Sequence, residues 1–214
     1  MVTNEQEAQQ VVIRHIGGCA WPTLLLLVSC AVIYLAAVAR LLTDPAFSWW
    51  AMTGIAFCSY AIYTPLHDAV HGAVTGMSLE RRWVNEWTGY IAANFIGISF
   101  RAHRRSHLKH HRSTNHPSED PDMVLSASNV YQLMLAWLRG VPKEWLFAAS
   151  FGHFTDAEKV TVRREFIAIV LTRLIVLCFC ADLGVTLLTL LVGQLTGNAV
   201  LVTLFAWSVH HPHT

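Results

Sequence analysis

The first long apolar stretch of the chain, residues 17–39, is GGCAWPTLLLLVSCAVIYLAAVA and contains no charged residue. A helix of about 20 apolar residues is long enough to cross the hydrocarbon core of a bilayer. Trp21 stands at the start of the stretch, where a tryptophan is expected at the membrane interface. The stretch therefore predicts a membrane-spanning helix over residues 17–42.

The remaining sequence contains further stretches of this kind. Hydrophobic residues make up 54% of the 214-residue chain and charged residues only 14%, against about 25% in soluble domains. This composition excludes a disordered chain and argues against a soluble enzyme. Residues 46–66 are again uncharged, whereas the apolar block 166–209 is too long for a single span. Arg173 lies in that block, and we expect it to face protein rather than lipid. The predicted spans are residues 17–42, 46–66, 165–181 and 184–209.

These spans predict an all-α integral membrane fold, a single domain over residues 1–214 whose four transmembrane helices form two hairpins. The segment 67–164 between the hairpins carries most of the 15 Lys and Arg residues, which predicts a helical cap on the cytoplasmic side. Within it, residues 84–100 and 131–154 are apolar but short or interrupted by charges, and we expect interfacial helices there. The net charge of +1 gives no reason to expect a nucleic-acid partner.

Histidine is the unusual residue of this sequence, because most of the 12 histidines fall into three clusters near the cytoplasmic ends of predicted spans. The HxxxH pair of the first cluster shares one face of a helix, although this spacing also arises by chance. The second cluster, which includes HxxHH, is too dense to be explained by packing, and chance is an alternative for the third. The clusters are His67 and His71; His103, His107, His110 and His111; and His210, His211 and His213.

Clustered imidazoles predict a metal centre. Imidazole suits iron, zinc, copper and nickel, and because a zinc site takes four ligands, eight or nine histidines imply two metal ions. Ligation by the first two clusters together requires that residues 84–100 do not cross the membrane. Ligating histidines need an acceptor for their other ring N–H, and we expect it from Asp68, Asn115, Glu119, Asp120 or Asp122. The alternative for the last three is a solvated loop that turns at Pro121.

Three segments together resemble the membrane fatty acid desaturase/hydroxylase superfamily, in particular its bacterial members. The segments are HDAVH at residues 67–71, HLKHH at 107–111 and TNHPSEDPD at 114–122. The resemblance implies a histidine-ligated di-iron centre, O₂ as co-substrate and an external electron carrier such as a ferredoxin, at a bacterial inner membrane. It implies His67, His71, His107, His110 and His111 as ligands. His103 lies outside the pattern, and we place it in the shell around the ligands.

The chain departs from this superfamily at its end, because a last HxxHH box usually follows the fourth helix. We expect the chain to be a C-terminally truncated form of a longer protein, or else His210, His211 and His213 complete the metal site. The resemblance implies an O₂-dependent desaturase of fatty acyl chains in lipid metabolism. The alternatives are a β-carotene hydroxylase of the same superfamily, and an inactive fragment or membrane metal-binding protein. The predicted partners are bilayer lipid, an acyl or isoprenoid substrate and the electron carrier.

Overall fold

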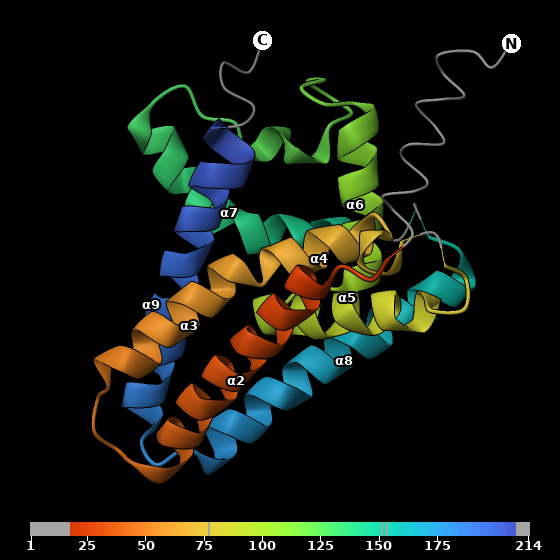
Figure 1. The fold of residues 1–214 in the computed structure, drawn as a ribbon. Coiled ribbons are helices and arrows are strands. Elements are labelled where there is room, and N and C mark those ends of the chain that lie inside the picture. The colour runs from red at the N-terminus through yellow and green to blue at the C-terminus, as the bar shows by residue number, and fades with distance from the viewer. Residues whose placement is uncertain (1–17, 77, 151, 153, 209–214) are drawn as a thin grey trace, which may run out of the picture.

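The computed structural model describes residues 18–76, 78–150, 152 and 154–208, and within these residues every regular element is a helix. The all-α prediction is thus confirmed for the described part of the chain (Figure 1). The elements are α2 (Trp21–Thr43), α3 (Trp49–Ala61), α4 (Tyr63–Val70), η1 (Ala73–Thr75), α5 (Arg82–Ile96), α6 (Phe100–Arg112), η2 (Pro121–Leu125), α7 (Val130–Ala149), α8 (Asp156–Phe179), α9 (Leu183–Leu201) and the π-helix η3 (Val202–Trp207).

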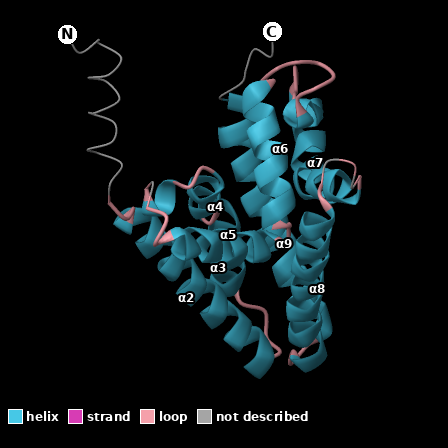
Figure 2. Ribbon diagram, turned by 90° about the vertical axis from the view of Figure 1, so that its right-hand side faces the viewer, coloured by secondary structure: helices cyan, strands magenta, loops and turns pink. Residues whose placement is uncertain are grey.

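Two helical hairpins, α2–α3 and α8–α9, extend to the end of the molecule opposite α6 (Figures 1 and 2). Their tips are joined, since the Ala181 backbone N–H donates to the Leu41 carbonyl at 2.9 Å. Helix α9 packs against α3 through glycines that let the two backbones approach. A Cβ on Gly197 would lie 2.3 Å from the Ala56 carbonyl oxygen, so a larger residue cannot occupy this position. Small residues bring membrane helices together in this way.

Among the described residues, two helices are long and apolar enough to cross a membrane, by length and composition alone: Trp21–Thr43 and Leu183–Trp207. Large apolar side chains on their outer faces are exposed, among them Leu25 on α2 and Leu191 on α9. Helix α8 exposes a similar face, which includes Ile175. Apolar surface of this extent is expected where lipid covers it. These features indicate an integral membrane protein, and the four-span arrangement stays a prediction.

The predicted span 46–66 is divided into two helices. Helix α3 ends at Ala61, and α4 begins at Tyr63 and continues to Val70. Pro65 explains the interruption, because proline has no N–H for the carbonyl four residues earlier and its ring crowds that carbonyl. The intervening Ile62 keeps helical dihedral angles. The histidines that follow the apolar run are therefore carried by a separate short helix.

Helix α8 starts well before the predicted residue 165. Thr155 caps it with a reciprocal pair of bonds: its hydroxyl accepts from the Glu158 backbone N–H, and the Glu158 carboxylate accepts from the Thr155 N–H at 2.9 Å. Such a capping box fixes a helix start. An apolar run marks only the part of a helix that contacts apolar surroundings, which is why the polar first turns were missed.

Residues 84–100 do not form one straight helix. Helix α5 ends at Ile96, Gly97 takes the left-handed region with φ of 91°, and α6 starts at Phe100 behind the Ser99 cap. A helix end inside a protein needs partners for its last carbonyls, and four consecutive ones have them here. Arg173 of α8 donates to the carbonyls of Asn94 and Phe95, Gln194 of α9 to that of Ile96, and Trp145 of α7 to that of Gly97. Arg173 faces protein, as predicted.

Candidate metal centre

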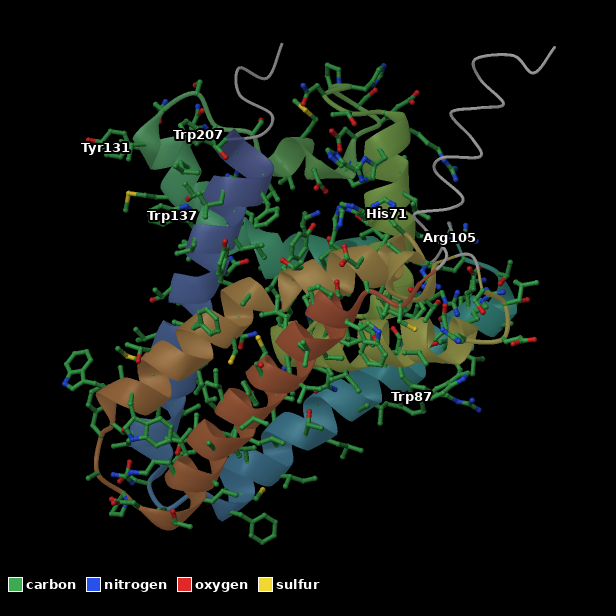
Figure 3. All side chains as sticks on the ribbon, viewed as in Figure 1. His71, Trp87, Arg105, Tyr131, Trp137 and Trp207 are labelled. Carbon is green, nitrogen blue, oxygen red and sulfur yellow. The ribbon has the colours of Figure 1, made fainter. Side chains whose placement is uncertain are left out.

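Helices α4 and α6 bring four imidazoles together. His67 lies on α4 and His71 at its C-terminal cap, and His107 and His111 lie one turn apart on α6. One ring nitrogen of each residue lies within 4.8 Å of one ring nitrogen of every other. Figure 3 shows His71 beside α6. The arrangement follows from two i, i+4 spacings whose helices face each other.

One carbonyl fixes α4 against its neighbours. The Ala69 oxygen, in the last turn of α4, accepts from Asn85 of α5 at 2.8 Å and from Arg104 of α6 at 2.9 Å. Directly after His71 the chain turns at Gly72, which has a φ of 73°, a conformation that glycine adopts without strain. The C-terminal end of α4 is thereby held at the position where its histidines meet those of α6.

The four imidazoles fit a metal ion by the chemistry of their donor atoms. Nε2 of His107 lies 2.9 Å from Nε2 of His111, so two potential ligand atoms point at each other. Burial first, and then the neighbouring His103 and His67, lower the pKa of His107 to about 2. Burial also lowers the pKa of His71. These shifts favour the neutral form of His71 and His107, which is the form that binds metal.

His110 directs its Nδ1 toward two carboxylates. Its Nδ1 lies 2.8 Å from Asp120 and 4.0 Å from Asp122, and these three residues form a second group with potential ligand atoms within 4.8 Å of one another. Asp120 is held by the backbone N–H groups of Asn115 and Asp122, both at 2.8 Å. Because Nδ1 pairs with Asp120, any metal bond of His110 would be made by Nε2. Asn115 takes part through its backbone rather than its side chain.

Asp68 anchors the first histidine pair to α2. The Thr23 hydroxyl donates to its carboxylate at 2.6 Å, and the other carboxylate oxygen lies 3.9 Å from Nδ1 of His67. The adjacent His67 ring and then the Thr23 hydroxyl keep the pKa of Asp68 below its usual value, against the effect of burial. A negative charge therefore sits behind the His67 ring, as expected for a partner of a ligating histidine.

Two functional candidates were missed in the sequence, Lys143 and Glu144 of α7. The Lys143 ammonium contacts the Asp122 carboxylate and lies 2.9 Å from Glu144, and Glu144 lies 3.2 Å from Nδ1 of His103. Burial opposes both charges, yet Lys143 and His103 hold the pKa of Glu144 below its usual range, and Glu144 and Asp122 raise that of Lys143. Helical spacing was the available signal, because Glu144 follows Ala136 and Gly140 on the buried face of α7.

A cavity of about 230 Å³ adjoins the histidines. Its polar wall is formed by His67, His103, His107, His110 and His111 together with Lys143 and Glu144. Its opposite wall is apolar and comes largely from the end of α9 and from η3, with Leu201, Val202 and Phe205. An apolar cavity with a few convergent polar groups is typical of a site for an apolar ligand.

The opposite face of α6 is basic. A surface hollow there is lined by Arg101, Arg104, Arg105, Lys109 and Arg112. Arg104 pairs with Glu86 at 2.7 Å and Arg105, which Figure 3 labels, pairs with Glu158 at 2.8 Å. Lys109 and Arg112 form no ion pair within the described part of the chain. One helix thus presents imidazoles to the cavity and unneutralised cations to the outside.

The third histidine cluster, His210, His211 and His213, lies outside the described residues.

The sequence was compared with family models, with curated proteins and with solved structures. A family model described as fatty acid desaturase matches residues 43–214. The matched range includes α4 and α6 with all of their histidines. No curated protein and no solved structure shows significant similarity to the chain.

Proposed function

The chain belongs to the fatty acid desaturase family, and from this premise we propose that it is an integral membrane, O₂-dependent di-iron oxidoreductase that desaturates fatty acyl chains. The observation that supports this most strongly is the convergence of His67, His71, His107 and His111 beside an apolar cavity. A reaction at an unactivated C–H bond needs a metal centre and a dry binding site in contact, and the two adjoin here.

The residues proposed to hold the two irons are those of the histidine clusters. They are His67, His71, His107, His110 and His111, with His210, His211 and His213 from the chain end. Bound iron supplies the activation of O₂ by electrons received from outside. The protein itself favours the neutral form of His71 and His107, and Asp68 and Asp120 orient the rings of His67 and His110. The apolar wall at Leu201, Val202 and Phe205 binds the substrate chain and excludes water.

The basic face of α6 is the proposed docking site for the electron carrier. Lys109 and Arg112 are adjacent in sequence to His110 and His111, so a carrier bound there would be separated from the centre by one helix, about 10 Å across. A negatively charged ferredoxin suits this surface by charge complementarity. The positive-inside rule places this face in the cytoplasm, at the inner membrane of a bacterium. Ordinary anchoring by basic residues is the competing explanation for these charges.

The direct test is a product assay with the purified chain in lipid nanodiscs, supplied with Fe(II), O₂ and a reduced ferredoxin. We expect iron-dependent loss of two hydrogens from an acyl lipid, detected by mass spectrometry. His107→Ala should abolish the product, and His116→Ala, an exposed histidine on the following loop, should not. Gain of one oxygen by β-carotene instead would favour the hydroxylase alternative. Absence of iron binding and of any product would favour an inactive fragment.

A further inference from the structure

His103 is a buried histidine for which the HxxHH pattern gives no role. It lies one turn before His107 on the same face of α6, with their ring centroids 5.5 Å apart, and it is only 4% exposed. Its Nε2 has no hydrogen-bond partner among the described residues, although the ring lines the cavity. Buried polar atoms are normally paired, because an unpaired one has lost its hydrogen bonds to water without gaining any within the protein. Its position therefore indicates a partner that the protein chain does not supply.

The surroundings of His103 repeat those of His110. In each case Nδ1 faces a carboxylate: Asp120 at 2.8 Å from His110, and Glu144 at 3.2 Å from His103. Metal-ligating histidines almost always direct their second ring nitrogen at such an acceptor. The pair His103–Glu144 joins α6 to α7 as the pair His110–Asp120 joins α6 to the loop before η2. In both rings the nitrogen left for a metal is Nε2.

Lys143 explains why Glu144 orients a ligand instead of being one. Its ammonium lies 2.9 Å from the Glu144 carboxylate and also contacts Asp122, so it links the two carboxylates and fixes the Glu144 side chain. Glu144 is itself only 4% exposed. Two carboxylates, those of Asp122 and Glu144, contact one ammonium, and the carboxylate of Asp120 lies beside that of Asp122. The excess of negative charge favours a further cation among these groups.

We propose that His103 is an additional iron ligand through Nε2, and that Glu144 is the positioning residue that holds its ring. This assignment rests on the proposed function for the presence of iron. It extends the ligand set beyond the residues that the family resemblance implies. It also accounts for the buried charges of Lys143 and Glu144 on α7.

The test is anaerobic metal titration of the metal-free chain in detergent, with Fe(II) and with Co(II) as a coloured probe. His103→Ala should weaken the binding of one of the two metal ions at least 10-fold and leave the other in place. Glu144→Gln, which keeps the side-chain volume, should weaken the same ion by about 10-fold and shift the visible absorption of bound cobalt. His116→Ala is the matched control and should change neither the affinity nor the spectrum.

The remaining variants separate the possible failures. Unchanged affinity and an unchanged cobalt spectrum in His103→Ala and His103→Gln would overturn the assignment of His103, provided that His107→Ala still loses metal. If His107→Ala also retained its metal, or the unaltered chain bound none, the proposed function itself would fail. His103→Gln keeps a polar side chain of similar size, so it gives the answer if His103→Ala does not elute as a monodisperse helical protein.

Discussion

The molecule contains two polar clusters that differ in how their atoms are paired. Around Arg173, each of four consecutive carbonyls at the end of α5 accepts a hydrogen bond from another helix. Around His107, ring nitrogens from α4 and α6 face one another within 4.8 Å. In the first cluster the donors and acceptors of neighbouring helices satisfy one another, whereas in the second cluster four potential metal ligands converge. Polar groups that satisfy one another support structure, and converging imidazoles indicate a metal site.

The largest effect should come from breaking the second cluster. With free Fe(II) at 1,000 times its Kd, bound metal should stabilise the unaltered chain against unfolding by about 4 kcal/mol per site. His107→Ala should remove most of this difference and leave the metal-free stability within about 1 kcal/mol. Unfolding monitored by circular dichroism in detergent, with and without Fe(II), measures both quantities. A metal-free His107→Ala protein that is already unfolded would show that this cluster, too, is structural.

The opposite behaviour is expected for the first cluster. Arg173→Met removes the side-chain donor to the Asn94 and Phe95 carbonyls, which should lower the free energy of unfolding by about 1–3 kcal/mol. The loss should be the same in the metal-free and metal-loaded protein, because Arg173 has no part in ligation. The same unfolding experiment measures it. Arg139→Met, at an exposed position of α7, is the control, and an equal loss there would remove the basis of the comparison.

A smaller effect is expected from the carboxylate that pairs with His110. Asp120→Asn keeps the shape of the acceptor for His110 but removes its charge, so iron affinity should fall by about 10-fold. Equilibrium titration with Fe(II) measures this fall. Glu119→Gln, the neighbouring exposed carboxylate, should leave the affinity unchanged. If both variants behaved alike, the effect would be one of overall loop charge and not of the His110–Asp120 pair.

The smallest effect concerns the outer face of α6. The double variant Lys109→Glu with Arg112→Glu should slow reduction of the iron-loaded protein by an acidic ferredoxin about 5-fold at low salt. The difference should shrink as salt screens the charges. Stopped-flow absorption follows the reduction. Dithionite, a small reductant, should reduce both proteins equally fast, and Arg82→Glu on α5 is the control for net charge.

The sequence predicted those features that depend on local spacing. The apolar runs indicated α2, α3 and α9, and the HxxxH spacing indicated that His67 and His71 share one face of a helix. Features that depend on distant partners were not accessible. Arg173 lies 79 residues from Asn94, and no local pattern shows that it completes the end of α5. Lys143 and Glu144 looked like charges that interrupt an interfacial helix, because their partners Asp122 and His103 come from other elements.

The interruption at Ile62 divides one apolar run into two helices with different neighbours. On one side of Ile62, α3 packs closely against α9 at Gly197. The end of α9 contributes to the apolar wall of the cavity. On the other side, α4 carries His67 and His71. Ile62 therefore separates the helix that packs against α9 from the helix that carries the candidate ligands. A substitution in α3 or α9 that reshapes the wall acts on a different helix from the one that places His67 and His71.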